Sequence, residues 1–165
     1  MSKRVKKIYV DMDGVLANFE KRWVDIYGFD PEMTHKHKAQ RKQEFQDFVD
    51  NKEFAVLEPM PDMHVLVEYL NDKLAHVPKE ILSSTAKEDY FDTLSVQKGA
   101  WLENHNIDWK PNFVPGKKHK YKYAQPGFVL IDDDRKNIED WNAAGGIGIL
   151  HRDAITTIAL LKVLK

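Results

Sequence analysis

Cysteine is absent from the 165-residue sequence, which excludes a disulfide framework, a thiolate nucleophile and a zinc site with cysteine ligands. The sequence also lacks an apolar run of about 18 residues, the length that a membrane-spanning helix needs. Its basic start, residues 1–7, leads directly into a short apolar run and not into the longer apolar segment of a signal peptide. We therefore expect a cytoplasmic protein that does not associate with membranes.

An excess of charge of one sign is missing too, because basic and acidic residues nearly cancel to a formal net charge of −1. Such a chain is not an electrostatic binder of nucleic acids as a whole, so no stable nucleic-acid partner is expected. Hydrophobic residues make up 42% of the sequence and charged residues 31%, which is typical of a globular protein. The length suits one well-cored domain with a small insertion.

Two aspartates follow the first apolar run. Residues 8–10 are apolar without alternation, as in a strand that is buried on both faces of a parallel sheet. Asp11 and Asp13 come directly after this run, and Gly14 permits a sharp turn or the close approach of a ligand. Because unpaired carboxylates are costly to bury, the two aspartates indicate a positive charge nearby.

A second apolar run, residues 128–131, ends in Asp132 and Asp133. The carboxyl ends of strands in an open α/β sheet border one crevice, so both acidic ends can converge on one cation. Carboxylate oxygens are hard ligands that suit Mg²⁺, and the ligand spacing of a calcium-binding EF-hand loop is absent. The two strand ends therefore predict a magnesium site.

Two further features could serve the same crevice. Ser83 and Ser84 follow the apolar residues 81–82, where their hydroxyl groups could face a ligand or form a polar turn and helix N-cap. Lys98 interrupts the apolar stripe of an expected helix over residues 89–104, so its ammonium could reach the crevice or extend to the surface. Because of the acidic pairs, we favour a crevice role in which Lys98 neutralises a substrate phosphate or the aspartates.

The order of the expected elements predicts an α/β fold. Strands and helices alternate along the chain, which indicates a mostly parallel sheet flanked by helices. Residues 34–51 are the exception, because they are strongly polar with one short apolar stripe, and we expect a thin helical insertion there that lies over the main domain. Residues 117–122 are basic, which is typical of a solvated loop but is also compatible with contacts to phosphates.

This set of motifs resembles that of a known superfamily. In chain order, the four motifs of the haloacid dehalogenase (HAD) superfamily of phosphatases are matched by Asp11-x-Asp13-Gly14-Val15-Leu16, Ser83, Lys98 and Asp132-Asp133. Within the superfamily the chain most resembles the 5'(3')-deoxyribonucleotidases, and this likeness is carried by residues 11–19, 57–61 and 130–133. Asn18 departs from the aspartate that is usual in that family.

The resemblance implies a Rossmann-like HAD core of residues 1–18 and 58–165, with a small helical cap of residues 19–57. It implies magnesium-dependent hydrolysis of (deoxy)ribonucleoside monophosphates through an aspartyl-phosphate intermediate. Asp11 would be the nucleophile and Asp13 the general acid and base. The implied ligand-binding residues are Ser83, Ser84 and Lys98 for phosphate, Phe19 for the rest of the substrate, and Asp11, Asp13, Asp132 and Asp133 for Mg²⁺.

The same motifs are compatible with other functions. A phosphatase acting on polynucleotide 3' ends could bind the strand through residues 117–122, and another small phosphomonoester could also be the substrate. A non-catalytic phosphate-binding module could use the same fold, but it would have no need of Asp13. Phe19 either stacks on a base or packs inside the cap, and packing is the favoured interpretation for Trp23 and Phe45.

Overall fold

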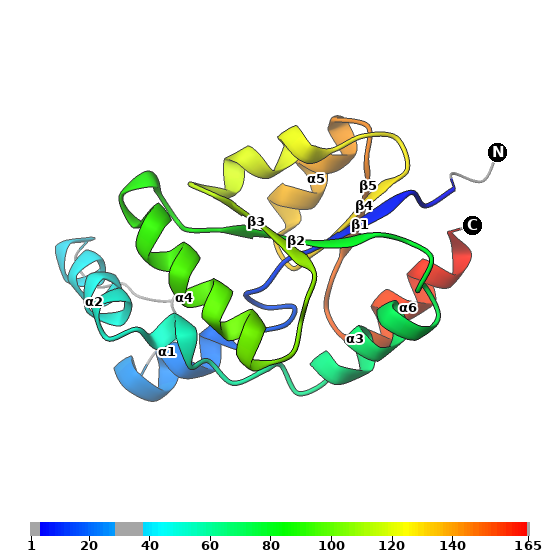
Figure 1. Cartoon of the computed structure of the whole chain (residues 1–165). Coiled ribbons are helices and arrows are strands. Elements are labelled where there is room, and N and C mark those ends of the chain that lie inside the picture. The colour runs from blue at the N-terminus through cyan, green and yellow to red at the C-terminus, as the bar shows by residue number, and fades with distance from the viewer. Residues whose placement is uncertain (1–3, 29–37, 165) are drawn as a thin grey trace.

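A parallel five-stranded sheet forms the centre of the protein (Figure 1). The computed structural model describes residues 4–28 and 38–164. The strand order is β3-β2-β1-β4-β5, with every neighbouring pair parallel. This architecture confirms the predicted α/β fold with helices on both faces of the sheet. The strands are β1 (Lys7–Val10), β2 (Lys79–Ser84), β3 (Lys110–Val114), β4 (Phe128–Asp132) and β5 (Ile147–Leu150).

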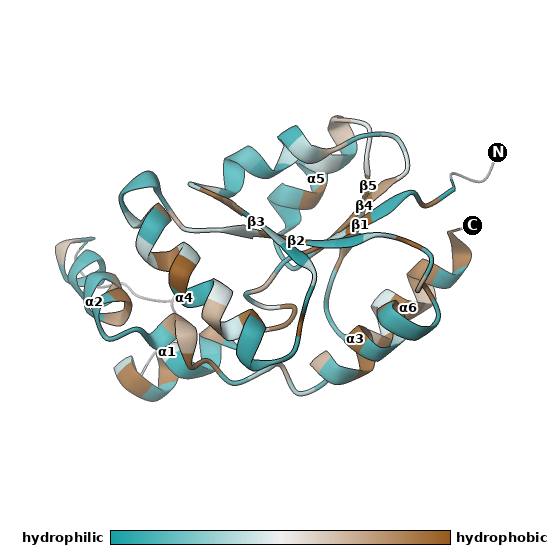
Figure 2. Ribbon diagram, viewed as in Figure 1, coloured by the Kyte–Doolittle hydropathy of each residue, from teal (hydrophilic) through white to brown (hydrophobic). Residues whose placement is uncertain are grey.

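The central strands are buried on both faces, which explains why their sequences show no polar alternation. In β1, Ile8 and Val10 belong to one hydrophobic cluster and Tyr9 to another on the opposite face. In β4, Ile131 and Leu130 divide between the same two clusters. Hydrophobic residues accordingly gather along the central strands in Figure 2, whereas α5 (Arg135–Ala143) is mostly hydrophilic.

Helices cover both faces of the sheet. The face of Ile8 packs against α3 (Met63–Asp72), α4 (Phe91–Asn104) and α6 (Ala154–Val163). The face of Tyr9 packs against α5 and the 3₁₀ helix η3 (Lys117–Tyr123), and Trp141 of α5 meets the Tyr9 ring edge-on. None of the helices that the described ranges contain is long and apolar enough to span a membrane.

Between β1 and α3 the chain forms α1 (Phe19–Tyr27), α2 (Lys38–Asp50) and the short 3₁₀ helix η1 (Glu53–Ala55), which lie beside α4 at one end of the molecule (Figure 1). Phe19, Phe48 and Phe54 hold these elements together through ring contacts of 5.0–5.4 Å between centroids. The insertion expected over residues 19–57 is therefore helical where it is described. Residues 29–37 of it lie outside the described ranges.

Strand β1 lies where the direction of sheet construction reverses, because β2 and β3 are on one side of it and β4 and β5 on the other. In open α/β sheets a crevice forms at such a switch point, outside the carboxyl ends of the strands. The carboxyl ends of β1 and β4 are the two acidic ends found in the sequence. The topology thus brings them together.

Candidate active site

The chain turns sharply after β1. The backbone N–H of Asp11 donates to the carbonyl of Ile131 at 3.0 Å, which ties the end of β1 to β4. The carbonyl of Met12 then accepts from the N–H groups of Leu16 and Ala17, and this closes a compact loop. The Met12 N–H donates to Asp11 Oδ1 at 2.8 Å, so the carboxylate is oriented by its own loop.

Gly14 allows this loop to pass against Asp133. Its φ is +85°, and a Cβ at this position would lie 2.0 Å from Asp133 Oδ2. Both the left-handed backbone and the space therefore require glycine here. The sequence suggests a sharp turn or the close approach of a ligand at Gly14. In the structure the turn is present, and the group that lies close to Gly14 is the carboxylate of Asp133.

We expect Gly14→Ala to lower the melting temperature and to abolish turnover. Backbone strain at positive φ costs about 1–2 kcal/mol, and the clash with Asp133 adds to it and displaces that carboxylate. Gly145→Ala is the matched control, because its φ is +97° and a Cβ there meets no described atom within 4 Å. Thermal unfolding and phosphate release would be measured on both variants; equal effects would contradict a special role for the Gly14 position.

A buried lysine joins the two acidic strand ends. Lys120 Nζ lies 2.9 Å from Asp11 Oδ1 and 2.8 Å from Asp132 Oδ2, and the lysine is only 2% exposed. Asn137 of α5 donates from Nδ2 to the same Asp132 oxygen at 3.0 Å. Lys120 therefore supplies part of the positive charge that the buried carboxylates require at this position.

One lysine does not compensate all the negative charge at the site. Burial and the neighbouring Asp132 raise the pKa of Asp11 well above its ordinary value, although Lys120 opposes this. Burial and Asp132 also raise the pKa of Asp133 to about 7. Burial alone would lower the pKa of Lys120, but the carboxylates of Asp11 and Asp132 outweigh it and raise this pKa. The cluster is electrostatically suited to a further cation.

Three carboxylates of the cluster fit a hard divalent cation. Each of Asp11, Asp132 and Asp133 offers one oxygen, and these oxygens all lie within 4.8 Å of one another. An all-oxygen ligand set is the type that Mg²⁺ prefers. The side chain of Asp13 is not part of this carboxylate group.

Lys98 lies on the other side of the cavity and contacts Asp13. Its Nζ is 2.9 Å from Asp13 Oδ2, 2.8 Å from Ser83 Oγ and 2.9 Å from the Ser84 carbonyl oxygen. The residue is 1% exposed, within the apolar stripe formed by Leu94 and Trp101 of α4. It does not extend to the surface but reaches the crevice, where Asp13 is its acidic partner.

The two serines occupy different places. Ser83 is buried behind Lys98, whereas Ser84 lines a cavity of about 630 Å³ that also contains Asp11 and Asp13. Phe19 contributes to the wall of this cavity and of a neighbouring one of about 380 Å³. The structure thus brings the predicted residues to one cavity, with Ser83 placed to hold Lys98.

Lys120 and Asn137 were not among the residues singled out from the sequence. The expected loop over residues 117–122 is instead the 3₁₀ helix η3, whose three-residue repeat turns Lys120 and Tyr123 toward the sheet. No local pattern distinguishes Lys120 from the other lysines of residues 117–122. Lys117 pairs with Asp134 at 2.7 Å, so two lysines of this segment are engaged within the protein and not free to bind a strand.

The fold and the site define a hydrolase of the HAD superfamily, of the phosphatase type. A model of the family described as "5' nucleotidase, deoxy (Pyrimidine), cytosolic type C protein" matches residues 4–157, and the chain belongs to this family. This finding confirms the resemblance drawn from the motifs, both to the superfamily and to its deoxyribonucleotidase branch. A comparison with curated proteins gave no match.

Solved structures share the fold at low sequence identity. A hydrolase from Streptococcus pneumoniae TIGR4 is 14% identical with a TM-score of 0.58, and the alignment covers 96% of this chain and 99% of that one. A phosphonoacetaldehyde hydrolase-like protein from Oleispira antarctica is 12% identical with a TM-score of 0.50, covering 89% and 72% of the two chains. At this identity the likeness supports the fold alone.

Proposed function

We propose that the protein hydrolyses nucleoside monophosphates in a magnesium-dependent reaction that passes through an aspartyl-phosphate. The observation that carries this proposal is the pairing of each aspartate of the β1 loop with its own buried lysine, Lys120 at Asp11 and Lys98 at Asp13. Two carboxylates held in different surroundings can take different roles, one as nucleophile and one as acid and base. The family description, which names a 5' nucleotidase, supports the substrate class.

Asp11 is the nucleophile in this proposal. Its Oδ1 is held by the Met12 N–H and by Lys120, while Oδ2 accepts no hydrogen bond from the described residues. Oδ2 is therefore available to attack phosphorus, which forms the aspartyl-phosphate and releases the nucleoside oxygen. Water then attacks the phosphorus of the intermediate, which frees orthophosphate and regenerates Asp11.

Asp13 transfers the protons. Its side chain is about one-third exposed (32%) and borders the cavity, so it can reach both the leaving oxygen and a water molecule. In the first step it donates a proton to the departing oxygen, and in the second it accepts one from the attacking water. Lys98, at 2.9 Å, orients the carboxylate for both steps.

The phosphate is bound by positive charge and polar groups around the cavity. Lys98, Lys120 and Ser84 border the space in front of Asp11. Of the loop amides, those of Met12 and Gly14 already donate within the protein, which leaves the Asp13 amide for a phosphate oxygen. Such charge neutralisation and positioning contribute most of the catalysis in phosphoryl transfer.

Asp11, Asp132 and Asp133 would hold Mg²⁺, with the backbone carbonyl of Asp13 as a further ligand. When bound, the ion neutralises phosphate charge and aligns the phosphorus for in-line attack. Asn137 and the Asp134 N–H hold the carboxylate of Asp132 through hydrogen bonds of 3.0 and 2.9 Å. This hydrogen bonding fixes the orientation of the ligand oxygens.

We assign residues 19–57 as a cap over a core of residues 1–18 and 58–165. Phe19 stacks on Phe54 with centroids 5.4 Å apart, so it packs within the cap, yet it also lines both cavities. One of its edges can therefore meet the substrate while the ring holds the cap together. Trp23, which is 2% exposed, serves mainly as a packing residue.

The direct test is a phosphate-release screen over deoxy- and ribonucleoside monophosphates, sugar phosphates and phosphorylated oligonucleotide ends. Each substrate is assayed with Mg²⁺ and with a chelator. We expect release from nucleoside monophosphates that requires Mg²⁺. Release from none of them, or equal release with the chelator, would overturn the proposal.

We expect Lys98→Met to lower kcat/KM by about a hundredfold, since one charged donor at a reacting group contributes on this scale. Methionine keeps the apolar stem between Leu94 and Trp101, so the melting temperature changes little. Lys73→Met, at an exposed position after α3, is the control. Retained turnover with a large loss of stability would show that Lys98 is a packing residue instead.

A further inference from the structure

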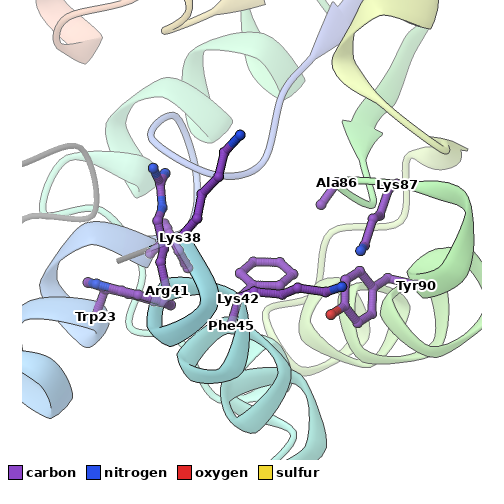
Figure 3. A pocket seen from close by; sticks show the side chains of 9 residues that line it. Trp23, Lys38, Arg41, Lys42, Phe45, Ala86, Lys87 and Tyr90 are labelled. Atoms are coloured by element: carbon purple, nitrogen blue, oxygen red, sulfur yellow. The ribbon is translucent and has the colours of Figure 1, made fainter. Parts of the chain in front are cut away.

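The cavity next to the reaction centre is basic as well as aromatic. Lys38, Arg41 and Lys42 of α2 line it, together with Lys87 from the loop after β2. Figure 3 shows Lys42 and Lys87 extending toward Tyr90, and Lys38 and Arg41 extending from α2 in a common direction. Lys87 Nζ lies 5.2 Å from the centroid of the Tyr90 ring. Four cationic side chains thus surround the aromatic residues that line this small cavity.

The three cations of α2 have no acidic partner within the described ranges: no described carboxylate pairs with Lys38, Arg41 or Lys42. On α1, by contrast, Lys21 pairs with Asp25 at 2.8 Å and Arg22 with Glu53 at 2.7 Å.

The spacing of these cations along α2 makes them repel one another, which destabilises the helix unless an anion is bound. Lys38 and Lys42 are four residues apart and Lys38 and Arg41 three apart, so they lie on one face of α2 and repel each other. Phe45 continues that face, at the same spacing from Arg41 and Lys42. A bound anion would turn this repulsion into attraction, and an aromatic ring beside it would accept a flat apolar group.

The basic cavity is continuous with the reaction centre. Phe19, Arg41, Phe45 and Ala86 line both cavities, so a substrate whose phosphate lies at Asp11 extends its remaining part between these residues. In a nucleoside monophosphate that remaining part is neutral. It would contact the aromatic residues of the cavity and leave Lys38, Arg41 and Lys42 without an anion among the described residues.

We propose that the preferred substrates are nucleotides that carry a second phosphate, which Lys38, Arg41 and Lys42 bind while the first phosphate is hydrolysed. This inference rests on the proposed function and specifies its substrate class. Hydrolysis consumes one water molecule and releases one orthophosphate from the reaction centre, and the second phosphate stays on the product. A phosphate carries a charge of about −1.5 to −2 at neutral pH, which suits several unpaired cations.

The test compares deoxythymidine 5'-monophosphate, deoxythymidine 3',5'-bisphosphate and a 5'-phosphorylated dinucleotide. Wild type is compared with the double variant Lys38→Gln, Lys42→Gln, whose residues line only the basic cavity, and with the control Lys162→Gln on α6. We expect a kcat/KM about tenfold higher for one of the two substrates with a second phosphate than for the monophosphate, because charge-assisted contacts to phosphate give energies of that order. The double variant loses that preference, keeps its activity on the monophosphate and unfolds at the wild-type temperature.

The second and third substrates distinguish the source of the second phosphate. A preference for the bisphosphate would identify a free nucleotide as the substrate. A preference for the dinucleotide would identify the end of a strand as the substrate. Either result supports the inference. Equal kcat/KM for all three substrates, or an equal loss for all of them in the double variant, would overturn it.

A binding measurement separates failure of this inference from failure of the proposed function. If no compound is hydrolysed, the proposed function fails, and calorimetric titration of the Asp11→Asn variant then decides the substrate class. Binding of the bisphosphate about tenfold tighter than the monophosphate, lost when Lys38→Gln and Lys42→Gln are added, supports the second-phosphate site. Equal binding of the two compounds overturns it.

Discussion

Asp11→Asn is expected to lower kcat by at least about a thousandfold, because the neutral amide cannot attack phosphorus while the remaining residues still bind substrate. The substitution preserves the shape of the side chain and the contact of its oxygen with the Met12 N–H. Steady-state phosphate release with Mg²⁺ measures the effect. Wild-type turnover in this variant would exclude Asp11 as the nucleophile.

The same variant is expected to stay folded. Asp11 is buried beside Asp132 and Asp133, so removing its charge relieves repulsion, while Lys120 keeps Asp132 as its partner. The melting temperature should therefore equal or exceed that of wild type. Asp25→Asn on α1 makes the same chemical change at an exposed ion pair and should leave turnover unchanged. Unfolding of the Asp11 variant would show that the carboxylate is needed for the structure itself.

Lys120→Met is expected to destabilise the protein by about 3–5 kcal/mol, the usual cost of removing one partner from a buried ion pair. Two buried carboxylates, Asp11 and Asp132, lose their shared ammonium, and the hydrogen bond from Asn137 cannot replace its charge. Turnover should be lost as well. Chemical denaturation with and without Mg²⁺ measures the effect, and we expect the ion to restore part of the stability because it supplies positive charge at the same carboxylates.

Lys117→Met is the matched control on the same 3₁₀ helix. Lys117 pairs with Asp134, but its side chain is 60% exposed, and such pairs contribute at most about 1 kcal/mol. We expect almost no change in stability and no dependence of that change on Mg²⁺. Similar stabilities for the two variants would contradict the view that Lys120 neutralises the buried carboxylates.

The acidic strand ends could be predicted from the sequence because local rules determine them. Apolar residues without alternation specify a strand buried on both faces, and whatever follows such a strand in a parallel sheet emerges at the crevice. Asp11 and Asp132 were found by this reasoning alone. Lys98 was found because it interrupts an apolar stripe in a chain that also has acidic strand ends, and in the structure Asp13 is its partner.

Lys120 could not be found in this way, because its partners lie far from it in the chain. A lysine within a basic segment looks like a solvated residue, and only the packing of η3 against the sheet buries it between Asp11 and Asp132. The direction of a hydroxyl group is also decided by tertiary contacts: Ser83 turns toward Lys98, whereas its neighbour Ser84 borders the cavity.

By itself, then, the sequence determined the α/β fold, the pair of acidic strand ends and the order of the motifs, since these follow from patterns between near neighbours in the chain. Only the tertiary structure decided which lysine pairs with which aspartate, and that Lys38, Arg41 and Lys42 line the cavity next to the reaction centre. These features depend on long-range contacts. The function of a charged side chain depends on the carboxylates or the cavity beside it, and segments distant in the sequence bring these within a few ångströms.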